Sequence, residues 1–152
     1  MPRNFFDCLF TNIEDSWELG TRAQALLEYV AQTYSVFSDT PLPPPSSVTD
    51  QSADLSSVFD IARDIVSARQ DGDGPQPLME DGSAADPASN GVAVLLANWT
   101  GQGGSGGPDY AKAATEQLQF LLENVPRSND GAISHRTSQA QLWYINFYCS
   151  SS

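Results

Sequence analysis

The chain has 152 residues, of which 40% are apolar, so it can form one domain with a core and is too apolar to be disordered throughout. Nineteen acidic residues against seven Lys and Arg give a formal net charge of −12, which repels phosphate backbones and anionic lipid and argues against nucleic-acid or membrane partners. No stretch approaches the ~20 apolar residues that span a bilayer. The first ten residues, which Asp7 interrupts, do not read as a signal peptide.

The apolar spacing predicts a first helix over about 16–34, with Asp15 or Ser16 as its N-cap and Glu18 early, where the helix dipole favours an acid. Trp17 occupies an apolar position of this helix and is expected in the core. A proline run over 41–45 follows, either as a rigid connector or as a ligand for proline-reading domains. A second helix is expected over about 54–70, where apolar residues recur every three or four positions.

The third predicted helix, over about 88–99, is apolar on all sides, which is typical of a helix packed against several neighbours. The fourth begins after Pro108 and ends before Pro126. Its expected buried face consists of seven residues: Tyr110, Ala113, Ala114, Leu118, Leu121, Leu122 and Val125. Trp99 is expected in the core. Strand-like alternation is confined to the short run "WYINFY", so the predicted fold class is all-α.

Few residues suggest metal or cofactor chemistry. One His and two distant cysteines do not make a zinc pattern, and Cys8 and Cys149 are either free thiols or a disulfide pair. The acidic run "DGDG" (71–74) reads as a turn, because Pro75 stands at the next calcium-ligand position. The glycine-rich run 101–107 lacks the preceding strand of a dinucleotide loop, so no cofactor is expected. Asn98 opens a glycosylation sequon.

Several stretches together resemble fungal six-hairpin glycosidases. They are "SWELGTRAQALLE" (16–28), "NGVAVLLANWT" (90–100), "YAKAATEQLQFLLENVPRSNDGAISHR" (110–136) and "QLW" (141–143). The nearest groups are glycoside hydrolase families 105 and 88, the unsaturated rhamnogalacturonyl and glucuronyl hydrolases. The resemblance implies helical hairpins forming part of an (α/α)6 barrel, an incomplete toroid. It also implies an N-terminal extension (1–15), a partial glycosidase-like domain (16–143) and a divergent tail (144–152).

The same resemblance bears on catalysis. In these families an Asp two residues after the Trp of "LW" protonates the double bond of an unsaturated uronic acid and directs water to it. Here that position holds Ile145, which can neither donate nor accept a proton. The family-like sequence ends abruptly at Trp143, which suggests truncation. The expectation is a protein without glycosidase activity on its own, and the family suggests secretion.

Three residues are expected to bind substrate, and each has a plainer alternative. His135 either bonds a sugar hydroxyl or carboxylate, or is an ordinary loop histidine. Arg136 either pairs with a uronate carboxylate or neutralises a neighbouring acid. Trp143 either stacks on a sugar ring or packs in the core.

Two functional hypotheses follow from these observations. The first is a truncated relative of unsaturated uronyl hydrolases, whose partner is an oligosaccharide. The second is a stand-alone helical binding or effector protein. In that case an exposed hairpin face, freed by the missing hairpins, leads to self-association or binding of a protein partner.

Overall fold

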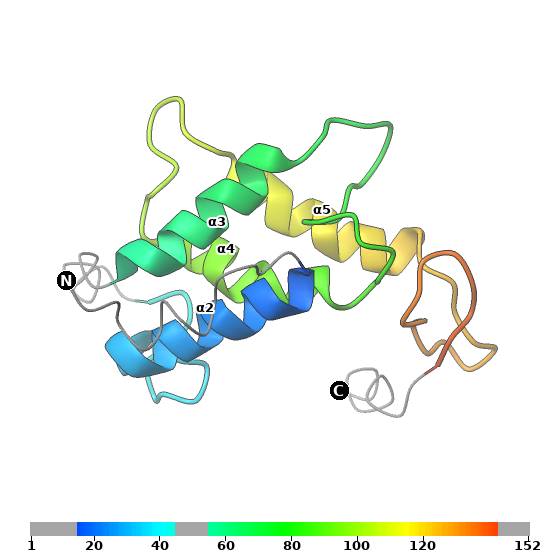
Figure 1. Cartoon of the computed structure of the whole chain (residues 1–152), viewed down its shortest axis with the longest axis horizontal. Coiled ribbons are helices and arrows are strands. Elements are labelled where there is room, and N and C mark those ends of the chain that lie inside the picture. The colour runs from blue at the N-terminus through cyan, green and yellow to red at the C-terminus, as the bar shows by residue number, and fades with distance from the viewer. Residues whose placement is uncertain (1–14, 45–54, 143–152) are drawn as a thin grey trace.

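The computed structural model describes residues 15–44 and 55–142, which form helices and long connecting loops (Figure 1). The helices are α2 (Ser16–Val30), η1 (Gln32–Tyr34), α3 (Ser56–Ala68), η3 (Pro87–Asn90), α4 (Gly91–Trp99) and α5 (Tyr110–Glu123), where η marks a 3-10 helix. Within the described ranges, β pairing is limited to two isolated bridges, so the predicted all-α class is confirmed. No described helix is both long and apolar enough to cross a bilayer.

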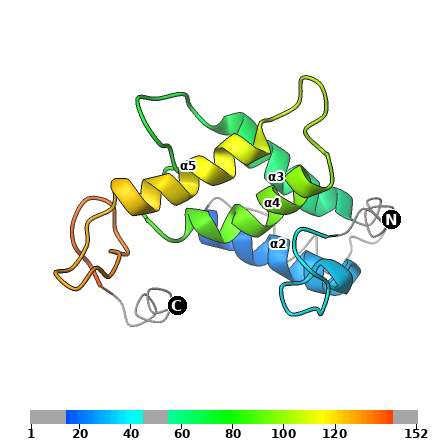
Figure 2. The ribbon, with the colours of Figure 1, turned by 180° about the vertical axis from the view of Figure 1, so that it is seen from behind.

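Helix α4 lies at the centre of the packing. It contacts α2, α3 and α5, and both views place it between α2 and α5 (Figure 1, Figure 2). Four of its nine residues are buried, namely Ala93, Val94, Leu96 and Ala97. The segment is apolar on all sides because the helix packs against several neighbours, as predicted. The further arrangement of these helices as hairpins of an (α/α)6 barrel stays a prediction.

The first helix begins as predicted and ends early. Asp15 is its N-cap, and the carboxylate of Glu18 accepts a hydrogen bond from the Asp15 backbone N–H at 3.4 Å in a capping box. The helix stops at Val30 because Ala31 leaves helical geometry, with φ −150° and ψ 57°. Residues 32–34 then form η1. The single helix expected over 16–34 is therefore two elements.

A close approach between α2 and η3 fixes the start of α2. A Cβ on Gly20 would stand 2.0 Å from Ser89 Oγ, so only glycine lets the two elements pack this closely. The Asn90 Nδ2 donates to the Ser16 carbonyl at 2.8 Å, and the buried Ser16 hydroxyl donates to Asp81. Because the first turn directs Ser16 inward, Trp17 points to solvent and is 51% exposed.

The predicted core position of Trp17 is therefore wrong, and Trp99 is only half-buried. Helix α5 differs from prediction in the same way. Tyr110, Ala113 and Gln117 are its buried residues, whereas Leu118 and Leu122 are 57% and 53% exposed. The polar Gln117 takes the inward position because its Oε1 accepts a hydrogen bond from Leu78 N at 2.7 Å.

Candidate functional site

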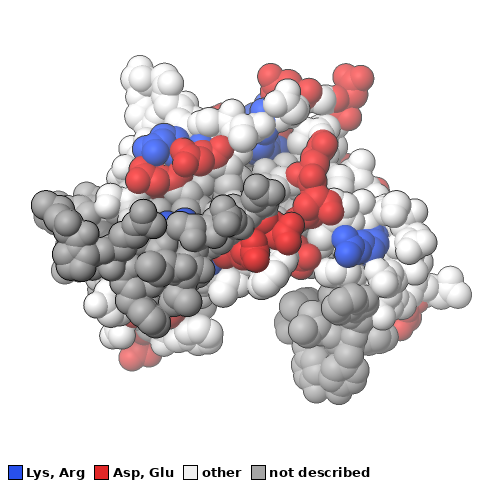
Figure 3. Space-filling view, in the orientation of Figure 1, with Lys and Arg blue, Asp and Glu red and all other residues white. Residues whose placement is uncertain are grey.

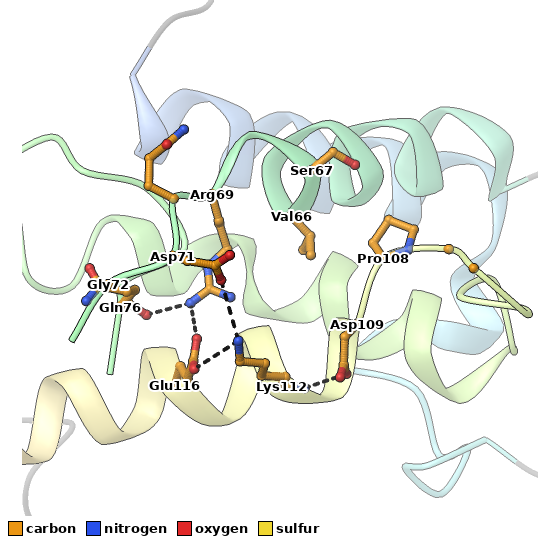
Figure 4. Close-up of a pocket in the computed structure, with 13 residues that line it drawn as sticks. Val66, Ser67, Arg69, Asp71, Gly72, Gln76, Pro108, Asp109, Lys112 and Glu116 are labelled. Carbon is orange, nitrogen blue, oxygen red and sulfur yellow. Dashed lines mark hydrogen bonds and ion pairs between the residues drawn. The ribbon is translucent and has the colours of Figure 1, made fainter. Parts of the chain in front are cut away.

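Two of the cavities along α5 combine side chains from several segments, one at each end of the helix. The first, here called the Arg69 cavity, has a volume of about 410 Å³ and lies between the end of α3 and the start of α5 (Figure 4). Its walls come from the loop after α3, from the glycine loop before α5 and from the first two turns of α5. A Cβ on Gly107 would stand 1.9 Å from the Gly103 carbonyl oxygen, so glycine is needed for this loop to fold back on itself.

Arg69 organises this cavity. It directly follows α3, and its guanidinium donates from Nη2 to the Gln76 carbonyl at 2.9 Å and from Nε to the Pro77 carbonyl at 3.2 Å. The same Nη2 lies 2.6 Å from Glu116 Oε2 on α5 (Figure 4). The two side chains are only 11% and 20% exposed. The planar fork of arginine can bond two loop carbonyls and a carboxylate together, so it ties the loop to α5.

Lys112 is the second cation of the Arg69 cavity. Its Nζ lies 3.7 Å from Asp71 Oδ1 and 3.7 Å from Glu116 Oε1, and its side chain is 55% exposed. Both distances exceed an ordinary hydrogen bond, so these ion pairs are loose. Asp109 is used differently, since its Oδ1 accepts from the Lys112 backbone N–H at 2.9 Å and caps α5. The charges of this cavity are therefore largely engaged with the protein itself.

The second cavity, here called the Phe120 cavity, has a volume of about 550 Å³. Residues 76–83 form one wall, and Phe120 and Asn124 from the last turn of α5 and its C-cap form another. Thr137 from the loop after α5 closes it. The lining residues combine an aromatic ring, a carboxylate, two amides and two hydroxyls: Phe120, Glu80, Gln76, Asn124, Ser83 and Thr137. Gln76 lines both cavities, so the backbone held by Arg69 forms part of the wall between them.

The predicted site loop lies at the edge of the Phe120 cavity. The His135 carbonyl accepts from Ala84 N at 2.8 Å, and Arg136 forms an antiparallel bridge with Ser83. A Cβ on Gly82 would stand 4.0 Å from Arg136 Nη1, which places this exposed guanidinium at the rim. His135 is half-buried and does not line the cavity. The structure therefore brings the 135–137 segment beside residues 82–84, a contact between segments some fifty positions apart.

Some of the other residues singled out from the sequence lie outside the described residues, and some lie within them. Trp143, Ile145, Cys8 and Cys149 lie outside the described residues. Asp130 and Gly131 lie in a tight turn in which Gly131 N donates to the Ser128 carbonyl at 3.0 Å and Gly131 has φ 90°. Asn98 is exposed at the end of α4, so the sequon does not lie on a buried surface. Throughout 15–44 and 55–142, no three His, Cys, Asp or Glu residues are grouped closely enough to hold a metal ion.

Acidic residues predominate on the described surface, and most of the described ion pairs hold a Lys or Arg against one of them. Figure 3 shows acidic side chains in a band down one face, with few Lys or Arg among them. Burial raises the pKa of the Tyr110 phenol, which lies behind the glycine loop, and Arg63 opposes this shift. Ion pairing with Asp60, 2.8 Å away, raises the pKa of Arg63. Arg136 has no ion pair of that kind among the described residues and is the cation beside the Phe120 cavity.

Sequence reasoning did not identify Arg69, Glu116 or Phe120. Arg69 and Glu116 are 47 positions apart, and no periodicity connects them. One usable signal was present, because Lys112 and Glu116 stand four residues apart on a predicted helix, the spacing of an ion pair. Phe120 could have been suspected because it falls off the apolar stripe of the predicted helix.

Comparison of the chain with protein-family models, with curated proteins and with solved structures gives no match. The glycosidase resemblance therefore stays a prediction from the sequence.

Proposed function

We propose that this chain is a helical, glycosidase-like protein that binds an acidic oligosaccharide at the Phe120 cavity and does not hydrolyse it alone. The observation that supports the proposal is the lining of that cavity. A sugar needs hydrogen-bond donors and acceptors for its hydroxyls and an apolar surface for its ring, and Phe120, Asn124 and Thr137 supply both. Arg136 at the rim can pair with the carboxylate of a uronate.

The number of carboxylates in the Phe120 cavity supports the second half of the proposal, that the chain alone does not hydrolyse the sugar. Among the described lining residues of the Phe120 cavity, Glu80 is the single carboxylate. Ordinary glycoside hydrolysis uses a pair, one group as acid and the other as base or nucleophile. In the family that the sequence resembles, one Asp performs the hydration, and its position here holds Ile145. Within the described part of the chain, a ligand in this cavity therefore meets one carboxylate, Glu80, and no second acid to work with it.

Titration calorimetry with an unsaturated glucuronyl disaccharide and with unsaturated galacturonyl-rhamnose tests the binding. We expect saturable binding, weakened about tenfold, or ~1.4 kcal/mol, by Arg136→Ala because the charge pair with the uronate is lost. The matched control is Arg63→Ala, which removes another exposed arginine, one that pairs with Asp60 on α3. Absence of binding, or equal loss in both variants, would contradict the proposal.

Loss of double-bond absorbance tests the second half of the proposal. We expect no change in absorbance when the same disaccharides are incubated with the full chain. Turnover that disappears when one acidic residue is replaced would show a working enzyme and overturn this half, while leaving the binding site intact.

A second candidate function is binding of a polar ligand through the Arg69 cavity, whose lining carries more charged side chains. It is less favoured because Arg69, Glu116 and Asp109 are already bonded to the protein. Lys112→Ala separates the two sites, since it should leave sugar binding at the Phe120 cavity unchanged.

A further inference from the structure

Helix α5 carries an apolar stripe that faces solvent. Ala111, Thr115, Leu118 and Leu122 recur at spacings of three and four, so they lie along one side of the helix, and all four are exposed. Among the described elements α5 packs mainly against α4 and also against η3. Its buried residues, Tyr110, Ala113 and Gln117, lie on the other side of the helix from the stripe. Figure 2 shows α5 at the near side of the molecule, beside α4.

The stripe is more apolar than its composition suggests. The Thr115 hydroxyl donates to the Ala111 carbonyl at 2.8 Å within the same helix. Its polar group is satisfied there, so burial of Thr115 leaves no donor without a partner. Both leucines are more than half exposed, a position that costs free energy in water unless something covers them.

Charges flank this stripe in a self-complementary way. Lys112 and Glu123 are eleven residues apart, about three helical turns, so they lie on the same flank at opposite ends of α5. Leu118 lies midway between them. If a second α5 packs antiparallel across Leu118, a two-fold axis brings Lys112 of each copy, whose pairs with Asp71 and Glu116 are long at 3.7 Å, to Glu123 of the other. Gln119 is exposed and lies between Lys112 and Glu123 on the same flank. In this arrangement it faces Gln119 of the second copy, and the two side-chain amides can hydrogen-bond to each other.

We infer that the chain forms a two-fold dimer in which the Ala111–Thr115–Leu118–Leu122 stripe packs antiparallel against that of a second copy. The contact is small. A 14-residue helix is about 21 Å long, and one such helix pair buries less than the ~800 Å² per partner of a stable complex. The dimer is therefore weak and depends on concentration. It leaves the Phe120 cavity open, because Phe120 and Asn124 lie off the stripe, so the inference does not rest on the proposed function.

Sedimentation equilibrium of the full chain over a wide concentration range tests the inference. We expect a reversible monomer–dimer equilibrium whose dissociation constant rises at least about tenfold in Leu118→Lys, because a desolvated ammonium replaces the central leucine. Phe37→Ser is the control. Phe37 is also an exposed apolar residue, at 84%, but it lies in the segment after η1 and not on α5. Circular dichroism confirms that each variant stays folded, and Leu122→Lys serves as a second probe.

Charge exchange tests the antiparallel register. Lys112→Glu and Glu123→Lys should each weaken the dimer, because each places like charges opposite one another, and the double variant should restore it. A parallel pair would not show this rescue. A monomer at every concentration, a dimer that survives Leu118→Lys, or a dimer lost in Phe37→Ser would each overturn the inference.

Discussion

Two long loops meet α5, and they are held in different ways. The first, here called the clamp loop (residues 69–80), is tied to α5 by side-chain contacts: its Arg69 bonds Glu116 of α5, and Gln117 of α5 accepts from Leu78 N of the loop. The second, here called the closing loop (residues 126–142), is held by its own serines and backbone. Ser134 N donates to the Pro126 carbonyl at 2.8 Å, and the Ser134 hydroxyl donates to the Gln139 carbonyl at 2.9 Å.

The difference shows where each loop derives its shape. The clamp loop is positioned by the helical core, because each anchor reaches across to α5, and both cavities depend on it. The closing loop carries most of its hydrogen bonds within itself, and it touches the helices through residues 82–84 and through Arg127, whose Nη2 donates to the Leu122 carbonyl near the end of α5 at 3.0 Å. Damage to an anchor of the clamp loop should therefore lower the stability of the whole domain. Damage within the closing loop should act more locally.

The largest effect is expected from Arg69→Ala. It removes two loop contacts and leaves Glu116 with its half-exposed Lys112 partner. We expect a loss of about 3 kcal/mol in the free energy of unfolding, measured by urea denaturation, because one partner of a largely buried pair is removed. The stability of Arg69→Lys should lie between that of the unchanged chain and that of Arg69→Ala, since the lysine ammonium keeps the positive charge but lacks the planar fork of the guanidinium.

Arg136→Ala in the closing loop is the matched comparison for Arg69→Ala. The Arg136 side chain is exposed, so its removal should change the free energy of unfolding by less than about 0.5 kcal/mol. Equal losses at the two arginines would remove the proposed distinction between the loops.

A smaller loss is expected from Gln117→Ala. The Leu78 N–H, buried with Gln117, would lose its acceptor, at a cost of about 2 kcal/mol. Hydrogen exchange should show the Leu78 amide losing protection. Gln119→Ala, two residues along on the exposed side of α5, should leave both quantities unchanged. A protected Leu78 amide in Gln117→Ala would mean that the loop has another anchor.

The helices and the two loops differ in how much of their structure could be predicted from the sequence. Apolar spacing predicted the four α-helices, because a one-sided helix must repeat its buried face every 3.6 residues, but it did not predict the short 3-10 helices η1 and η3. It placed Leu118 and Leu122 inside, where the structure has Gln117, because spacing cannot register that a glutamine finds its partner 39 positions away. The resemblance led to residues 135 and 136, which lie beside a cavity. The Arg69–Glu116 pair stayed out of reach, since only the folded chain brings the clamp loop to α5.

Within the closing loop, Ser134→Ala should cost about 1 kcal/mol. The buried hydroxyl accepts from Gln141 N at 2.8 Å and from Arg136 N at 3.2 Å, and both donors would lose it. We expect faster hydrogen exchange at Gln141, with amides of α4 unaffected, because the loop opens without the core. Ser138→Ala is the control, as Ser138 is exposed in the same loop. Uniform loss of protection in α4 would show that the closing loop is coupled to the core after all.

The smallest effect concerns Asp130 at the tip of the closing loop. A hydrogen bond from the Ser128 hydroxyl lowers the pKa of the Asp130 carboxyl below its usual range. A lowered pKa contributes stability that is present above the ordinary Asp value and is lost as the pH falls through the lowered value. In Ser128→Ala the Asp130 pKa should rise toward the ordinary value, followed by NMR of the carboxyl carbon, while Ser138→Ala leaves it in place. Because Asp130 is fully exposed, the unfolding midpoint near neutral pH should barely reflect this change. If the Asp130 pKa stays low in Ser128→Ala, a group other than the Ser128 hydroxyl stabilises the carboxylate. The tip of the closing loop would then not be held by the loop's own side chains.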